Sequence, residues 1–175
     1  VVAISVPEKY GAELVSVAWS GKGVYSNRGS TTDTIPMPEL WLRTLPERAD
    51  SVWDFSSWQA DAVVINLGTN DLAETNLDQA PFPDEYLAFV REVRAAYPTA
   101  HIVCTVGPLL SDWWPEGAQT LTRAREAIRG AAETLNAEGD AAVSFLEFQQ
   151  ETSSYGCDWH PNVARNEIMA GEIEA

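Results

Sequence analysis

Four short apolar runs, each followed by a glycine or a polar turn, constrain the fold of this chain more than any other feature. They span residues 14–19, 62–67, 101–106 and 142–146 and are rich in β-branched or aromatic residues. Runs of this length and composition are typical of strands that are buried on both faces of a parallel sheet. We therefore expect four parallel strands.

The segments between these runs carry the periodicity of amphipathic helices. Three helices are expected: one over residues 83–97, one that ends near Gly139, and one that starts at Pro161. A shorter helix is expected over residues 38–48. The apolar stripes are Tyr86, Val90, Val93 and Tyr97, then Leu121, Ala124, Ile128, Ala131 and Leu135, and finally Val163, Ile168 and Ile173. Strands that alternate with helices predict an α/β fold, a three-layer α/β/α sandwich with a mostly parallel sheet, in a single domain over residues 1–175.

The charge balance narrows the range of partners. The 175 residues include 26 acidic and 11 basic side chains, which gives a formal net charge of −15, and the arginines are spread along the chain. Nucleic acids and anionic membranes require a clustered basic patch, so neither is an expected partner. The chain also lacks the run of about 20 apolar residues that a membrane span needs. Cys104 and Cys157 fit no zinc spacing, and a disulfide between them stays open.

In an open parallel sheet the ligand site gathers in the loops beyond the carboxyl ends of the strands. His160 follows the fourth run and is a candidate proton carrier, because imidazole titrates near neutral pH. Asp158, two residues earlier, is placed to orient the ring. The alternative for His160 is a helix cap or a buried structural histidine. For His101, which begins a strand, we favour the structural interpretation.

Two further loops carry groups that can stabilise an oxyanion. The side-chain amide of Asn70 and the backbone N–H of Gly21 follow neighbouring runs and can donate hydrogen bonds to one point. The alternative for residues 68–71 is an ordinary turn between a strand and a helix. The combination of a glycine turn, an Asn-Asp turn and an Asp-x-His turn favours the functional interpretation.

Together these motifs resemble those of SGNH-type hydrolases, and more narrowly those of carbohydrate esterase family two, the acetylxylan esterase-like deacetylases. The resemblance covers nearly the whole chain and rests on residues 18–23, 38–45, 53–58, 63–71 and 158–162. It implies a flavodoxin-like sheet and a serine esterase that removes O-acetyl groups from xylan or related plant polysaccharides or their oligosaccharides. It also implies a secreted, extracellular protein that needs no cofactor. The oligomeric state is left open.

The resemblance also assigns roles to individual residues. It implies that Gly21 and Asn70 form the oxyanion hole, that His160 is the general base, and that Asp158 or a backbone carbonyl orients His160. The wider superfamily has its aspartate three residues before the histidine, whereas Asp158 stands two residues before it.

The nucleophile departs from the family pattern. SGNH hydrolases carry their serine in a Gly-Asp-Ser motif after the first strand, and no such triplet occurs here. Ser20 occupies the glycine turn and lacks the nucleophile-elbow pattern, and Ser5 would leave too short a crossover to the next strand. The chain also begins at Val1 without an initiator methionine. We expect a fragment that is inactive alone and lacks a first strand between residues 14–19 and residues 62–67.

The aromatic residues complete the candidate site. A flat ring beside a catalytic loop can stack on a sugar, and we predict this role for Trp159. Trp113 and Trp114 are candidates for the same role or for packing. Asp71 is counted as substrate-binding. Trp41, Trp53 and Trp58 are expected to pack.

One rival hypothesis is a non-catalytic carbohydrate-binding domain on a hydrolase scaffold. Another is a metal-dependent hydrolase with Asp71, Asp158 and His160 as ligands, which is weaker because this set has no recognised spacing.

Overall fold

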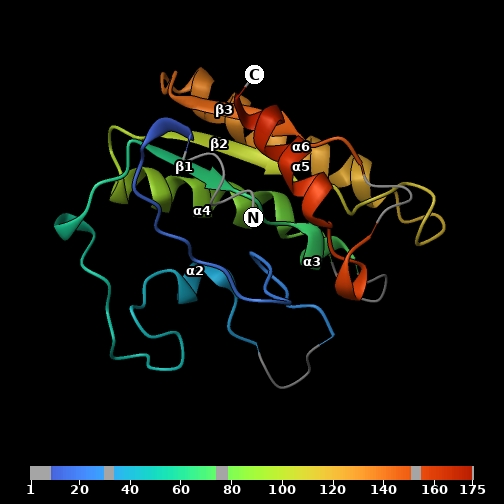
Figure 1. The fold of residues 1–175 in the computed structure, drawn as a ribbon, viewed down its shortest axis with the longest axis horizontal. Helices are drawn as coiled ribbons and strands as arrows, with labels where there is room; N and C mark the ends of the chain where they lie inside the picture. The colour runs from blue at the N-terminus through green and yellow to red at the C-terminus, as the bar shows by residue number, and fades with distance from the viewer. Residues whose placement is uncertain (1–8, 30–33, 74–78, 151–154, 175) are drawn as a thin grey trace.

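A three-stranded parallel sheet forms the centre of the computed structural model, which describes residues 9–29, 34–73, 79–150 and 155–174. The strands are β1 (Ala62–Ile65), β2 (His101–Val106) and β3 (Val143–Glu147), and they lie in this order (Figure 1). Val64 pairs with Val103, and Cys104 pairs with Phe145. The strands expected at these three positions are confirmed.

Three long helices complete the three-layer α/β/α architecture. They are α4 (Phe82–Ala96), α5 (Thr120–Ala137) and α6 (Val163–Glu174). Helix α5 packs against β2, β3 and α4, and in Figure 1 it lies behind the strands, whereas α6 passes in front of them. Among the described residues, no helix combines the length and the apolar character that crossing a membrane requires.

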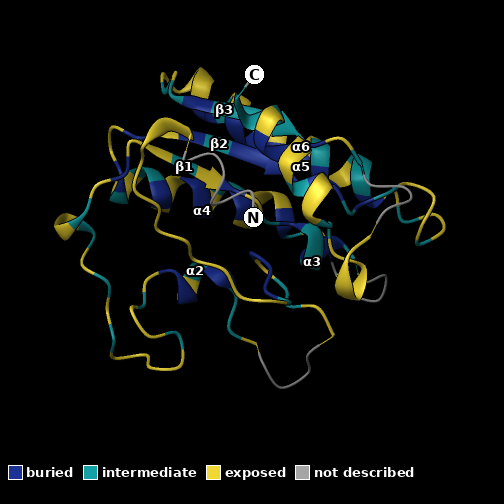
Figure 2. Ribbon diagram, in the orientation of Figure 1, coloured by how far each residue is buried: buried dark blue, intermediate teal, exposed yellow. Residues whose placement is uncertain are grey.

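The core lies between the sheet and helices α4 and α5. The stripes predicted for these helices are confirmed, and Tyr86, Val90, Ala124 and Ile128 are fully buried. Figure 2 shows the buried parts of α4 and α5 in dark blue. Helix α5 is followed by Gly139 at φ +103°, a left-handed conformation that favours glycine and ends a helix.

The apolar face predicted for α6 is wrong. Val163 and Ile168 are 62% and 50% exposed, whereas Arg165, Met169 and Ala170 are buried. The Arg165 guanidinium donates to the carbonyl of Gln149, in the loop after β3, and pairs with Glu172. These bonds turn the arginine side of the helix inward.

The strand expected over residues 14–19 does not form. Residues 9–20 are exposed throughout (yellow in Figure 2). Leu14, Val15 and Val17 present their side chains to solvent. A strand needs a neighbour for its backbone N–H and C=O groups. Strand β1 pairs with β2 alone among the described strands, so neither β1 nor residues 14–19 has a partner on the side where the missing strand was expected.

Residues 34–59 contain little regular structure and attach to α4 through aromatic rings. Helix α2 spans Met37–Leu40, which is shorter than the predicted helix over 38–48, and a single-turn helix, η1, spans Phe55–Ser57. The ring of Trp41 lies 4.5 Å from Phe55 and 5.5 Å from Phe89 on α4. The packing role expected for Trp41 is confirmed.

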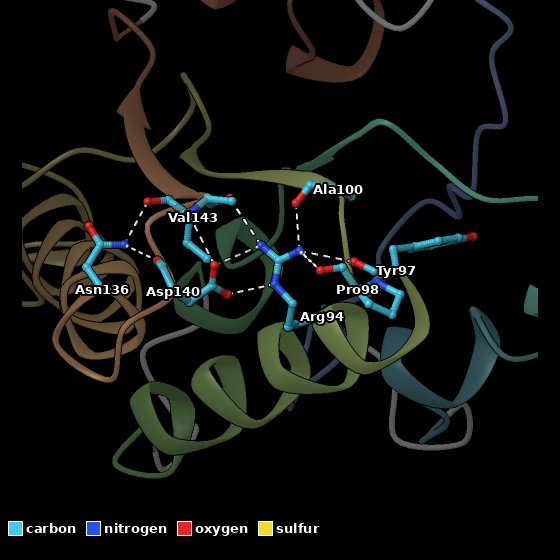
Figure 3. A network of polar contacts seen from close by, with 8 residues as sticks. Arg94, Tyr97, Pro98, Ala100, Asn136, Asp140 and Val143 are labelled. Atoms are coloured by element: carbon cyan, nitrogen blue, oxygen red, sulfur yellow. Dashed lines mark hydrogen bonds and ion pairs between the residues drawn. The ribbon is translucent and has the colours of Figure 1, made fainter.

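Arg94 ties α4 to the amino ends of β2 and β3 (Figure 3). Its Nε atom donates to Asp140 at 2.6 Å, and Nη1 donates to the carbonyls of Tyr97 and Ala100 at 3.0 and 2.6 Å. Nη2 donates to the carbonyl of Ala142 at 3.2 Å. One side chain thus satisfies several backbone acceptors at the end of the sheet away from the candidate site.

Candidate active site

Three loops that are distant in the sequence meet around one open hollow of about 470 Å³. The hollow contains five of the residues predicted for the site, together with Trp19, Ser20 and Arg28. The five are Gly21, Asn70, Asp158, Trp159 and His160. The candidate base His160 and the candidate oxyanion donors Gly21 and Asn70 therefore lie around one hollow.

His160 ends a tight turn that orients its ring. The turn contains the single-turn helix η2 (Cys157–Trp159), and the N–H of Gly156 donates to the carbonyl of His160 at 2.7 Å. The Nδ1 atom of His160 lies 3.3 Å from the carbonyl oxygen of Cys157. Because a carbonyl oxygen only accepts hydrogen bonds, this contact assigns the ring hydrogen to Nδ1. The Nε2 atom then keeps its lone pair, as a general base requires.

Asp158 lines the hollow but does not orient His160 through a hydrogen bond. No bond between the Asp158 carboxylate and the His160 ring occurs among the described residues, and the Cys157 carbonyl takes the orienting position. Asp158 and Trp159 have φ values of +52° and +60°, which are uncommon for residues other than glycine. The backbone of this turn therefore places the Asp158 and Trp159 side chains at the hollow.

Trp159 forms an aromatic wall of the hollow. Its side chain is 75% exposed, and its ring meets Tyr155 edge-on at 5.6 Å between ring centroids. A ring that is supported from one side and open on the other can stack on the apolar face of a sugar. Its position agrees with the one predicted from the sequence.

The two predicted oxyanion donors are held by local geometry. Gly21 adopts φ +80°, in the left-handed region that favours glycine. Asn70 lies in the short helix α3 (Thr69–Leu72) and donates from Nδ2 to the carbonyl of Lys22 at 2.8 Å. An amide nitrogen carries two hydrogens, so this bond fixes the side chain and leaves a second donor.

Helix α3 begins directly after Gly68, which the packing requires to be glycine. Gly68 adopts φ +111°, and a Cβ atom at this position would lie 2.9 Å from the ring of Phe82. The same turn sends Asn70 toward the hollow and the neighbouring Asp71 toward the loop of residues 24–26.

Arg28 is a site residue that the sequence analysis missed. It lines the hollow, and its backbone N–H donates to the carbonyl of Gly21 at 2.9 Å. The sequence signal for Arg28 is its place in the loop after the glycine turn, which does not by itself distinguish it from a surface arginine. Among the described residues that line the hollow, Ser20 is the one with a hydroxyl group.

Trp113 and Trp114 lie outside the hollow. They belong to the segment between β2 and α5 and are 74% and 67% exposed, which excludes packing in the core. The hydroxyl of Ser111 bridges the backbone of Trp114, accepting from its N–H at 3.2 Å and donating to its carbonyl at 2.9 Å. Their predicted role in sugar binding stays a prediction.

The structure corrects the role assigned to Asp71. Its carboxylate is buried and accepts hydrogen bonds from the backbone N–H groups of Val24, Tyr25 and Ser26 at 3.1, 2.7 and 3.0 Å. Burial raises the pKa of Asp71, and the three N–H donors act in the opposite direction. A carboxylate that is enclosed in this way cannot bind substrate.

The same placement removes the hypothesis of a metal site formed by Asp71, Asp158 and His160. Asp71 faces the backbone of residues 24–26, and within the described ranges no three His, Cys, Asp or Glu side chains gather as metal ligands would.

The two cysteines are free thiols. Burial raises the pKa of Cys104 to about 11, and Cys157 is exposed in the turn before His160.

Comparison with known proteins identifies similar chains. The model of the GDSL-like lipase/acylhydrolase family matches residues 4–168. The cellulase/esterase CelE of Acetivibrio thermocellus is 39% identical over 161 residues, which cover 91% of this chain and 19% of that protein. The acetylxylan esterase/glucomannan deacetylase of Cellvibrio japonicus is 31% identical over 101 residues, which cover 57% of this chain and 28% of that protein.

A solved structure extends the similarity to the fold. A family two carbohydrate esterase from Clostridium thermocellum, in complex with cellohexaose, superposes with a TM-score of 0.87 at 35% identity. The superposition covers 98% of this chain and 51% of that one. The resemblance to carbohydrate esterase family two is confirmed, and the chain spans about half of this solved relative and less of the curated ones.

Proposed function

The chain belongs to the GDSL-like lipase/acylhydrolase family, and from this premise we propose that it is part of a serine carbohydrate esterase. Its reaction is the removal of O-acetyl groups from xylan or a related plant polysaccharide or its oligosaccharides. The observation that carries the proposal is the shared hollow, which is lined by an imidazole with its Nδ1 atom bound to a carbonyl and by the two proposed oxyanion donors. We also propose an extracellular location for the protein, where its polysaccharide substrate would lie.

The first half of the reaction forms an acetyl-enzyme. A serine hydroxyl attacks the acetyl carbonyl carbon while Nε2 of His160 takes the hydroxyl proton. The carbonyl oxygen becomes an oxyanion, which accepts hydrogen bonds from the N–H of Gly21 and from Nδ2 of Asn70. The tetrahedral intermediate then collapses, and His160 returns the proton to the departing sugar oxygen.

The second half regenerates the enzyme. Water attacks the acetyl-enzyme carbonyl, His160 takes the water proton, and acetate leaves as the serine regains its proton. Asp158 supplies the acidic side chain of the hollow in which the imidazolium forms. No cofactor takes part in these steps.

We assign the nucleophile to a serine outside residues 1–175, because the chain has no Gly-Asp-Ser triplet. Among the described residues, no strand pairs with residues 14–19 or with the edge of β1 opposite β2, which supports this assignment. A strand that paired with both would end beside the hollow, at the carboxyl end of β1. Its serine would face His160.

Aromatic residues account for glycan binding in this proposal. Trp159 stacks on the sugar that carries the acetyl group, and the exposed pair Trp113–Trp114 contacts sugars farther along the polymer. The complex of the clostridial relative with cellohexaose supports a glycan ligand.

A non-catalytic carbohydrate-binding domain is the second candidate function. The observation that favours it is the combination of exposed tryptophans with a chain that lacks the family's serine motif. Titration of xylo-oligosaccharides against tryptophan fluorescence separates the two functions. Binding without turnover, even after a Gly-Asp-Ser segment is restored, would favour the binding domain.

Hydrolysis of p-nitrophenyl acetate tests the esterase proposal. We expect negligible turnover from residues 1–175 and turnover from the same chain joined to the segment encoded upstream of Val1, which should contain Gly-Asp-Ser. In that longer polypeptide His160→Ala should abolish turnover, and Asn70→Ala should cost roughly 3 kcal/mol of transition-state stabilisation. Turnover by residues 1–175 that Ser20→Ala abolishes would show that the nucleophile is assigned wrongly.

A further inference from the structure

The carboxylate of Asp71 accepts hydrogen bonds from the backbone of one loop. Oδ1 accepts from Tyr25 and Ser26, and Oδ2 accepts from Val24. Three consecutive backbone N–H groups that converge on one point form an anion-binding concavity. Only 2% of Asp71 is exposed, so the carboxylate binds these donors without competition from bulk water.

The loop that Asp71 holds is the loop that carries Gly21. The carbonyl of Gly21 accepts the N–H of Arg28 at 2.9 Å, which closes residues 21–28 into a ring of chain around the carboxylate. Gly23 lines the inside of this ring: a Cβ atom there would lie 2.5 Å from Oδ1 of Asp71. The carboxylate therefore fills the centre of the loop.

The neighbouring residue Asn70 binds the same loop from the same helix. Its Nδ2 donates to the carbonyl of Lys22, directly after Gly21. The contacts of Asn70 and Asp71 join the two segments that carry the oxyanion donors, so a shift of the loop would change the distance between the donors.

We propose that Asp71 is a positioning residue of the oxyanion hole, which sets the backbone N–H of Gly21 against the side-chain amide of Asn70. The inference rests on the proposed esterase function for its catalytic consequence. It assigns Asp71 no contact with substrate: the residue acts through the loop of residues 21–28.

The test is Asp71→Asn, which keeps the size of the side chain and replaces one acceptor oxygen with a donor amide. In ¹H–¹⁵N NMR spectra of residues 1–175 we expect the Gly21 amide and the Asn70 side-chain amide to shift. Amide hydrogen exchange at Val24–Ser26 should accelerate by about tenfold or more as bonds are lost. Exchange in β2 should stay unchanged, which would show that the fold persists.

The catalytic consequence is a split between kcat and KM. In the polypeptide that contains the nucleophile, Asp71→Asn should lower kcat for p-nitrophenyl acetate by about tenfold and leave KM nearly unchanged, because the oxyanion forms after binding. A loop that only stabilised the fold would lower the unfolding midpoint without this split.

Asp54→Asn is the matched control. Asp54 also accepts a backbone N–H, from Ser56 at 3.0 Å, but it is exposed beside η1 and does not line the hollow. The Asp54→Asn substitution should leave the Gly21 and Asn70 resonances and kcat unchanged. Unshifted resonances in Asp71→Asn, or shifted resonances with normal kcat, would overturn the proposal. An inactive parent enzyme would count against the esterase function alone, because the NMR measurement needs no turnover.

Discussion

Two regions of the chain bury their apolar side chains in different ways: residues 60–150 and residues 9–59. The first region contains all three strands and the helices α4 and α5, and its apolar side chains face one another across the sheet. The second contains the four-residue helix α2 and the three-residue helix η1, and it leaves Leu14, Val15 and Val17 in solvent. It is attached through Trp41 and through the loop around Asp71. The difference shows that a segment forms a helix or strand here when a neighbouring element supplies its hydrogen-bond and packing partners.

The largest effect should come from breaking the aromatic attachment of the second region. Trp41→Ala removes the ring that joins Phe55 to Phe89, and a buried Trp replaced by Ala costs about 3 kcal/mol in the free energy of unfolding. Urea denaturation measures this cost. Trp114→Ala removes the same side chain from an exposed position and should cost less than about 0.5 kcal/mol. Equal losses would mean that the second region is not held by Trp41.

Removal of Arg94 tests the first region at the amino ends of its strands. Arg94→Ala leaves the carbonyls of Ala100 and Ala142 without this donor and Asp140 without its cation, and it should cost about 2 kcal/mol. The loss should appear in the same urea experiment as a lower midpoint with an unchanged m-value. Arg48→Ala, which removes an exposed ion pair with Asp50, is the control and should be nearly neutral.

The pH dependence of stability should differ in sign between two carboxyl groups, that of Glu147 in β3 and that of Asp71, which binds the loop of residues 24–26 in the second region. Hydrogen bonds from Arg125 lower the pKa of Glu147 in β3, so its contribution is present above the ordinary glutamate pKa and is lost as the pH falls through the lowered value. Burial raises the pKa of Asp71, so its contribution is present below the ordinary aspartate pKa and is lost as the pH rises through the raised value.

Urea midpoints between about pH 3 and pH 7 measure both slopes. Glu147→Gln should remove part of the acid loss of stability, and the stability difference between wild type and Asp71→Asn should grow as the pH falls. Parallel curves for the wild type and both variants would contradict the two assignments.

The smallest effect is expected where the predicted strand failed to form. Val17→Ser in residues 1–175 should change the free energy of unfolding by less than about 0.5 kcal/mol, because the side chain already faces solvent. Val103→Ser in β2 is the comparison and should cost more. A large loss in the free energy of unfolding from Val17→Ser would show that residues 14–19 are buried in solution. A loss that grows with protein concentration would show that a second copy of the chain covers them.

Much of the first region could be predicted because its pattern is local. The spacing of Tyr86, Val90 and Val93 identifies both the helix and its buried face. For α6 the same logic chose the wrong face, since the burial of Arg165 depends on a carbonyl in another loop. Residues 14–19 have the composition of a strand, but composition does not supply the neighbour that a strand needs.

The site divides in the same way. Gly21, Asn70 and His160 could be placed from the loops that carry them, and Trp159 followed from His160. Arg28 could not, because an arginine in a loop has no periodicity that distinguishes it from a surface residue. The inward direction of Asp71 depends on one helical turn after Gly68, and residue type alone does not reveal it.

The acceptor that orients His160 is a main-chain atom, and this affects how the site can vary among related proteins. Every amino acid at position 157 supplies the same carbonyl, so point mutation of Cys157 cannot delete the contact. Sequence drift at position 157 is tolerable as long as the bend of the chain is kept. The orientation of this proposed general base thus depends on the backbone conformation of the turn before it. Substitutions that stiffen or straighten this turn should therefore be selected against.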